Sequence, residues 1–138
     1  MTGPTLVCSA CGRTFTDRWR CDCGGVLDFA ERALPASDRP DPGRFDTRDG
    51  LWSFGAFLPV ERGPSLGEGM TPLVSAPAWD ARFKLEYVSP TGSFKDRGAT
   101  TTIGHAVACG ADRVVEDSSG NAGAAIATYA ARAGLDAE

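Results

Sequence analysis

A lysine follows a turn of small residues in the stretch SPTGSFKDRG, which covers residues 89–98. Lys95 lies where this turn gives way to a pattern typical of a helix. The positive end of a helix dipole disfavours an added positive charge, and a neutral amine is the form that acts as a nucleophile. The small neighbours Gly92 and Ser93 leave room for a ring. The stretch therefore predicts a lysine that holds an aldehyde cofactor as an imine, and the alternative is a solvated lysine in a first helical turn.

A second loop, SSGNAG at residues 118–123, also joins an expected strand to an expected helix. Gly120 and Gly123 free the backbone amides to face one anion, and Ser118, Ser119 and Asn121 add side-chain donors. The alternative is a simple helix cap made by Ser119 or Asn121. The two loops are one strand–helix unit apart. Parallel sheets covered by helices bind ligands at the carboxyl ends of their strands, so the two loops are expected to share one ligand site.

The third group is a cluster of cysteines near the N-terminus, with the spacing C-x2-C-x9-C-x-C. Two close pairs separated by a hairpin-sized stretch are typical of a tetrahedral zinc site, and four protein ligands make such a site structural. Reduced thiols without a metal and a redox dithiol are the alternatives. The expected zinc ligands are Cys8, Cys11, Cys21 and Cys23.

Four other polar groups are assigned no direct role in the chemistry. We expect Cys109 to be a buried and inert thiol, and His105, the only histidine, not to be a metal ligand. Asp96 and Arg97 follow the lysine directly, and we expect them to pair locally in the first turn of the helix.

The elements that must position these groups alternate between strands and helices. Period-two alternation predicts a strand over 82–88, and apolar spacing predicts helices over 95–111 and 119–135, with a short strand over 112–118 between them. Gly134 is a plausible end cap for the second helix. This order predicts an α/β fold with a partial parallel sheet covered by helices.

Composition divides the chain into three parts. Residues 1–30 form a small four-cysteine module, residues 31–64 a connector with an apolar anchor at 51–60, and residues 65–138 the start of the α/β domain. The cysteine module has so little apolar content that we expect it to need its metal to fold.

Charge and hydropathy exclude several classes of function. The formal net charge is −4, with 14 Lys+Arg against 18 Asp+Glu, which disfavours nucleic-acid binding. No run approaches the roughly 18 apolar residues of a membrane span, and the first residues lack the pattern of a signal peptide. The lack of a signal-peptide pattern favours the cytoplasm, where thiols stay reduced.

Together, SPTGSFKDRG and SSGNAG resemble the fold-type II pyridoxal-phosphate enzymes, which include threonine synthases, serine/threonine dehydratases and cysteine synthases. The stretches SLGEGMTPL (65–73) and CSACG…CDCGG narrow the resemblance to threonine synthases with a zinc-ribbon-like N-terminus. Such a lyase eliminates phosphate from O-phosphohomoserine and adds water to give threonine. A threonine/serine dehydratase, and a zinc-ribbon protein that only binds an anion or a partner, are the alternatives.

The resemblance implies a role for each matching residue. Lys95 resembles the lysine that forms the imine with pyridoxal 5'-phosphate and then moves protons at the substrate's α and β carbons. Asn121 resembles the residue bonded to the cofactor's ring hydroxyl, and Phe94 is expected to pack beside the ring. The residues that resemble the loop holding the carboxylate of the amino-acid substrate are Ser118, Ser119, Gly120, Ala122 and Gly123.

The resemblance also sets limits on this chain. It places the family's glycine-rich phosphate cradle, and the serine or threonine that faces the pyridine nitrogen, beyond Glu138. We therefore expect a longer parent enzyme that forms a homodimer, of which these 138 residues are an N-terminal portion that is inactive by itself.

Overall fold

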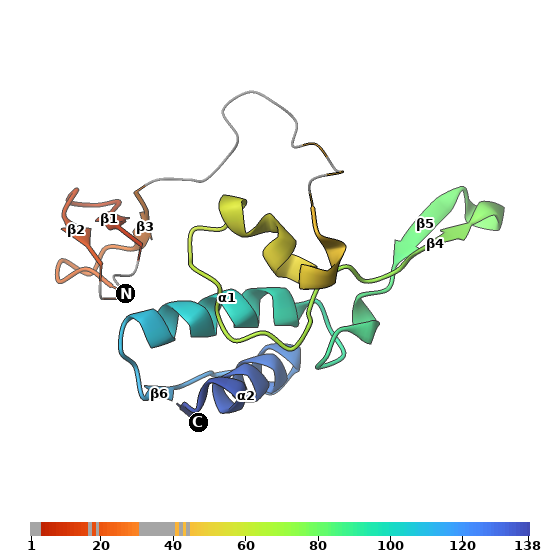
Figure 1. Cartoon of the computed structure of the whole chain (residues 1–138). Coiled ribbons are helices and arrows are strands. Elements are labelled where there is room, and N and C mark those ends of the chain that lie inside the picture. The colour runs from red at the N-terminus through yellow and green to blue at the C-terminus, as the bar shows by residue number, and fades with distance from the viewer. Residues whose placement is uncertain (1–3, 17, 19, 31–40, 42, 44) are drawn as a thin grey trace.

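The computed structural model describes residues 4–16, 18, 20–30, 41, 43 and 45–138 (Figure 1). Its strands are β1 (Leu6–Cys8), β2 (Thr14–Phe15), β3 (Leu27–Phe29), β4 (Leu73–Ala76), β5 (Ala81–Lys84), β6 (Arg113–Val114) and β7 (Asp136–Ala137). Its α-helices are α1 (Lys95–Ala108) and α2 (Asn121–Ala133), and its 3-10 helices are η2 (Thr47–Phe57), η3 (Pro77–Trp79) and η4 (Glu86–Val88). No helix of the described part of the chain is long and apolar enough to cross a bilayer.

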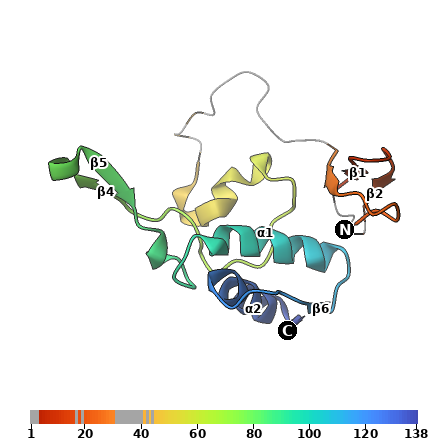
Figure 2. The same ribbon diagram turned by 180° about the vertical axis from the view of Figure 1, so that it is seen from behind.

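The two α-helices pack side by side and supply the main core. Ile103 of α1 and Tyr129 of α2 are completely buried, and the small residues Ala99, Ala125 and Ala130 complete the buried cluster around them. Alanines at a helix interface let the two backbones approach closely while they still exclude water. Both helices begin at the same end of the pair, as the views from front and back show (Figures 1 and 2).

The helices and the strand predicted within residues 95–138 are confirmed, but each is shorter than predicted. Helix α1 ends at Ala108 rather than residue 111, and α2 covers 121–133 within the predicted 119–135. Gly134 caps α2 in the left-handed conformation, with φ 77°, as predicted. The strand expected over 112–118 is limited to β6, which pairs in parallel with β7. This parallel pair on either side of α2 confirms the strand–helix–strand order of an α/β fold.

The strand predicted over 82–88 needs a correction. It ends at Lys84, and residues 86–88 form the 3-10 helix η4 instead. Moreover, β5 pairs antiparallel with β4, with Leu73 opposite Lys84 and Ala76 opposite Ala81. The two strands form a hairpin that projects from the helix pair (Figure 1), whereas the strand–helix order had placed 82–88 in the parallel sheet.

The N-terminal residues form a separate small sheet with the strand order β2-β1-β3, and all its pairs are antiparallel. In the connector, residues 31–40, 42 and 44 lie outside the described residues. Its apolar anchor forms much of η2, and there Trp52 is buried with 7% exposure. The connector then crosses α1 at a point where two glycine backbones meet.

At this crossing, a Cβ on Gly104 of α1 would lie 3.0 Å from the Cα of Gly63. We expect Gly104→Ala to lower the free energy of unfolding by about 1–3 kcal/mol, because backbone must move to admit the methyl group. Gly98→Ala is the matched control on the same helix, since a Cβ there meets nothing within 4 Å. Gly98→Ala should leave the free energy of unfolding unchanged or raise it by about 0.5–1 kcal/mol. Urea unfolding measures the free energy of unfolding of both variants. Equal changes in the two variants would contradict the close contact between the backbones of Gly63 and Gly104.

Candidate functional site

Lys95 is the first residue of α1, and its side chain is exposed. The turn before it is closed by a hydrogen bond from the amide of Gly92 to the carbonyl of Ser89, at 2.8 Å. The hydroxyl of Ser93 accepts a hydrogen bond from the amide of Lys95 at 3.3 Å. The Nζ atom lies 5.2 Å from the centre of the Phe94 ring. The amine is therefore presented at a helix start, beside an aromatic ring that is itself 57% exposed.

A buried carboxylate holds this turn in shape. Asp96 is completely buried and accepts hydrogen bonds from the amide of Thr91, at 2.8 Å, and from the hydroxyl of Thr91. A negative charge in the first turn of a helix is also stabilised by the helix dipole. Asp96 thus joins the two ends of the turn that carries Lys95, which confirms the local pairing expected for it.

Arg97 forms a two-pronged ion pair with Glu86 of η4. Its Nε lies 2.8 Å from Oε2, and its Nη2 lies 2.9 Å from Oε1. The hydroxyl of Thr71 also donates to Oε1 of Glu86. The Arg97 guanidinium, followed by the Thr71 hydroxyl, lowers the pKa of Glu86 to about 2. This ion pair fixes the first turn of α1 against the end of the hairpin.

Because its pKa is lowered from 4.5 to about 2, Glu86 stabilises the fold fully above pH 4.5. This contribution is lost as the pH falls through about 2. We expect Arg97→Met to cost roughly 1–3 kcal/mol of unfolding free energy at pH 7, with allowance for solvent screening. Urea unfolding at several pH values should show the difference from the unsubstituted protein shrinking below pH 4.5. A difference that is independent of pH would contradict the assignment.

The second loop forms a tight turn before α2. The amide of Gly120 donates to the hydroxyl of Ser118 at 3.3 Å, and the amide of Ala124 donates to the carbonyl of Gly120 at 3.1 Å. A Cβ on Gly123 would lie only 2.3 Å from the carbonyl oxygen of Ser118, so this position needs glycine. Ser119 and Gly120 are exposed.

The simple cap that was the alternative for this loop is wrong. The capping position is Gly120, which makes no side-chain cap, and Asn121 is the first residue of α2 with its side chain exposed. The first amides of α2 therefore keep their capacity to bind an anion.

The structure brings the two loops to the same end of the helix pair (Figure 2). Lys95 and Asn121 each begin a helix there, and the exposed Ser119 and Gly120 precede the second one. The start of α2 presents amides that can bind an anion, and both helix starts carry partial positive charge. An exposed amine, an aromatic ring and the anion-binding start of α2 are thus gathered at one end, an arrangement that suits an anionic aldehyde.

The four clustered cysteines converge as their spacing predicts. All four Sγ atoms lie within 4.8 Å of one another, and the pairs Cys8–Cys23 and Cys11–Cys21 are each 3.6 Å apart. A zinc ion bound at about 2.3 Å to four sulfurs holds them about 3.8 Å apart, so the sulfurs fit a zinc ion with a small adjustment. None of these four described cysteines forms a disulfide.

The surroundings of the cluster favour thiolates at two of its positions. The side chain of Arg13, whose Nε lies 3.5 Å from the sulfur of Cys11, lowers the pKa of that thiol to about 6, with help from the Arg13 backbone amide. The backbone amide of Ala10 lowers the pKa of Cys8. Thiolates are the form that binds metals, so these two positions suit metal ligands.

Cys109 is half-buried rather than fully buried, which corrects the expectation for this thiol. It is the C-terminal cap of α1, and its sulfur lies 3.7 Å from Nε2 of His105, one turn earlier. The last turn of a helix faces solvent more than its middle does. No cysteine or carboxylate of the described residues joins this pair in a metal-binding group.

Comparison with known proteins bears directly on this arrangement. Residues 64–138 match the family described as "Pyridoxal-phosphate dependent enzyme". This chain belongs to that family. The family implies pyridoxal phosphate as the cofactor, and the groups gathered around Lys95 and the 118–123 loop fit an anionic aldehyde with an aromatic ring.

Curated relatives of this chain include threonine synthases. The one from Methanocaldococcus jannaschii is 34% identical over 141 residues, which cover 92% of this chain and 35% of the relative. The one from Synechocystis is 46% identical over 135 residues, which cover 92% of this chain and 29% of the relative. The chain thus spans about a third of the length of these relatives.

Two residues that matter to the site carry no assigned role in the sequence interpretation. Glu68 is completely buried within the GEGMTPL stretch, and Glu86 holds Arg97 beside the lysine turn. A glutamate between two glycines is an unusual residue to bury, but the sequence alone does not show which donors surround it. For Glu86, the alternating pattern had indicated an ordinary strand position.

Proposed function

We propose that the complete protein is a pyridoxal-phosphate dependent lyase that converts O-phosphohomoserine to threonine and phosphate. The observation that carries this proposal is the placement of Lys95 and the 118–123 loop at the shared start of α1 and α2. The similarity to threonine synthases over nine-tenths of the chain supports the choice of substrate.

Each group at this end has a distinct role in the proposal. When bound, pyridoxal phosphate supplies an electrophilic aldehyde and an electron-withdrawing ring that stabilises negative charge on a substrate carbon. The Nζ of Lys95 is the nucleophile for that aldehyde and carries protons at the substrate's α and β carbons. Asn121 donates its side-chain amide to the ring hydroxyl, and Phe94 packs beside the ring.

The substrate carboxylate is assigned to the loop before α2. Backbone amides at a helix start bind carboxylates well, and the hydroxyls next to them add donors. Gly123 lets the loop close tightly on Ser118, since a Cβ there would lie 2.3 Å from the Ser118 carbonyl oxygen. The proposed carboxylate-binding residues are Ser118, Ser119, Gly120, Ala122 and Gly123.

A product assay on the complete protein tests the choice of reaction. O-Phosphohomoserine should yield threonine and phosphate in equal amounts. Release of ammonia from threonine or serine, without turnover of O-phosphohomoserine, would instead establish the dehydratase alternative. Each outcome requires pyridoxal phosphate, so a protein inactive toward all these substrates with the cofactor present would favour the anion- or partner-binding alternative.

We also propose that Cys8, Cys11, Cys21 and Cys23 hold a structural zinc ion. The close approach of the four sulfurs supports this assignment, and four protein ligands leave no open position for catalysis. A Cβ on Gly25 would lie 2.6 Å from the sulfur of Cys8, so glycine there lets the chain pass close to the cluster. Reduced thiols of this kind favour a reducing compartment such as the cytoplasm.

The proposed domain organisation follows the sequence prediction, with residues 1–30 as the zinc module, 31–64 as the connector and 65–138 as part of the catalytic domain. A homodimer of the complete protein is the remaining proposal. Analytical ultracentrifugation of the complete protein tests it, and a monomer at micromolar concentration would contradict it.

A further inference from the structure

Residues 65–71, called the strap below, lie against both helices that carry the proposed site. At its centre is Glu68, whose side chain is completely buried. A buried carboxylate is costly unless hydrogen bonds satisfy its oxygens, so the groups that face it show what the strap is built to hold.

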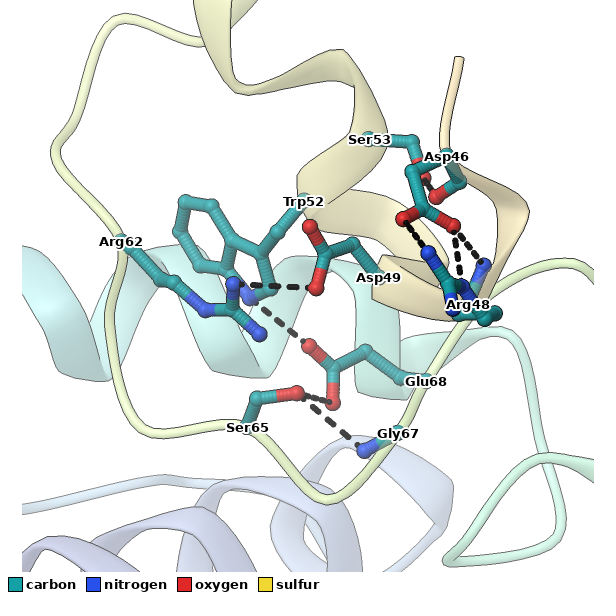
Figure 3. A network of polar contacts seen from close by, with 9 residues as sticks. All are labelled: Asp46, Arg48, Asp49, Trp52, Ser53, Arg62, Ser65, Gly67 and Glu68. Atoms are coloured by element: carbon teal, nitrogen blue, oxygen red, sulfur yellow. Dashed lines mark hydrogen bonds and ion pairs between the residues drawn. The ribbon is translucent and has the colours of Figure 1, made fainter.

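Donors from three different parts of the chain converge on Glu68. The indole Nε1 of Trp52 in η2 donates to Oε1 at 3.0 Å, and the hydroxyl of Tyr129 in α2 donates to Oε2 at 2.8 Å. Within the strap, the hydroxyl of Ser65 and the amide of Leu66 donate to Oε2 at 3.1 and 2.9 Å. Figure 3 shows the Glu68 carboxylate turned toward Trp52 and Ser65.

These donors keep the carboxylate charged. Burial raises the pKa of Glu68, but the amides of Leu66 and Glu68 and the Tyr129 hydroxyl outweigh burial and hold the pKa below its ordinary value. Burial, together with the charge of Glu68, raises the pKa of Tyr129. The Tyr129 hydroxyl therefore stays protonated and donates at neutral pH. Its hydrogen bond to the charged Glu68 is of the stronger, charge-assisted kind.

The end of the strap is bound to the other helix. The hydroxyl of Thr71 accepts a hydrogen bond from Nη2 of Arg97 at 3.3 Å and donates to Glu86, which pairs with the same arginine. Arg97 lies two residues beyond Lys95. Just before the strap, the hydroxyl of Thr100 in α1 donates to the carbonyl of Pro64 at 2.8 Å.

We propose that the strap positions the two helix starts relative to each other, with Glu68 as the positioning residue for α2 and Thr71 as the one for α1. Its centre contacts α2 through Tyr129, and its end contacts α1 through Arg97. Each of these helices begins with a residue of the proposed cofactor site. Neither Glu68 nor Thr71 is placed in contact with the cofactor. The inference rests on the proposed function, because the site it positions is the one assigned there.

The test compares two variants of α2 that each lose one hydroxyl group. Tyr129→Phe removes a donor to Glu68, whereas Thr128→Val removes a hydroxyl whose hydrogen bond lies within α2, to the carbonyl of Ala124 at 2.7 Å. In the complete protein, the Kd for pyridoxal phosphate is measured at a temperature where both variants are folded. We expect Tyr129→Phe to raise this Kd about tenfold, the effect of one lost hydrogen bond to a charged group, and Thr128→Val to leave it unchanged.

A second readout needs no cofactor and keeps the two proposals separable. The amide of Ala124 closes the first turn of α2, and its hydrogen exchange reports how firmly that turn is held. It should speed up about tenfold in Tyr129→Phe and stay unchanged in Thr128→Val. If pyridoxal phosphate does not bind the unsubstituted protein, the proposed function fails. The exchange rate of the Ala124 amide then tests by itself whether the strap positions the start of α2.

Ser65→Ala supplies a milder variant on the strap itself, in case Tyr129→Phe does not fold. It removes one of the donors to Glu68 and should change both readouts in the same direction by a smaller factor. Equal values for Tyr129→Phe and Thr128→Val in both readouts would overturn the proposal, as would a Ser65→Ala variant that is indistinguishable from the unsubstituted protein.

Discussion

Replacing Lys95 with alanine in the complete protein is expected to lower kcat for threonine formation by about 1,000-fold or more, because one group supplies both the nucleophile and the proton carrier. The loss should appear in kcat rather than in the stability of the fold, since the Lys95 side chain is exposed and the turn is held by Asp96. Steady-state kinetics and urea unfolding of the same variant separate the two effects.

The chain offers a matched control for this substitution, because Lys84 is its only other lysine. Lys84 donates to the carbonyl of Thr71 at 2.6 Å, a bond that arginine can also make. Lys84→Arg should therefore keep most of the activity. If Lys84→Arg were as damaging as Lys95→Ala, or if Lys95→Ala were nearly as active as the unsubstituted protein, the role given to Lys95 would be wrong.

Loss of zinc should have the second largest effect, and it should fall on the N-terminal module. Structural zinc sites supply about 10–16 kcal/mol of apparent binding free energy in small modules, and the short strands of this sheet bury little apolar surface to replace it. We expect one zinc ion per chain in the purified protein and none in Cys21→Ser, whose residues 4–30 should then be unfolded.

Atomic emission counts the zinc, and limited proteolysis reports whether the module is folded. Cys109→Ser is the control, because this thiol lies outside the four-cysteine cluster and the variant should retain its zinc. A purified protein without any metal, with the module still resistant to protease, would contradict the zinc assignment.

The sequence was sufficient to predict the features that depend on local pattern. The helical spacing of residues 95–108 and 121–133, the glycine that ends α2 and the cysteine spacing all correspond to the structure. In each case, residues close together along the chain determine the structure. The helices depend on side chains that share one face, the end of α2 on a left-handed glycine, and the cysteine cluster on two thiol pairs brought together by a hairpin.

The hairpin could not be predicted in the same way. Residues 82–88 alternate as a strand does, but the strand ends early, where the Glu86 side chain is bound by Arg97 and Thr71. These partners lie 11 and 15 residues away, and their effect on the backbone outweighs the local alternation. The antiparallel pairing with β4 likewise depends on residues 73–76, which showed only a short apolar run.

The strap was missed for a similar reason. Its glutamate lies 16 residues from Trp52 and 61 residues from Tyr129 along the chain, and no spacing rule connects the three. Buried polar networks depend on which donors the fold brings together. A buried tyrosine on an alanine-rich helix face was the one available signal, because a buried phenolic hydroxyl requires a partner.

The most direct test of the account is to reduce the complete protein with borohydride in the presence of pyridoxal phosphate and to map the labelled peptide. Lys95 and Lys84 are the two lysines of this chain, so the peptide map distinguishes them without ambiguity. The account predicts one label per chain, on Lys95, and none in Lys95→Ala. A label on Lys84 or on any other residue, or no label at all, would contradict it.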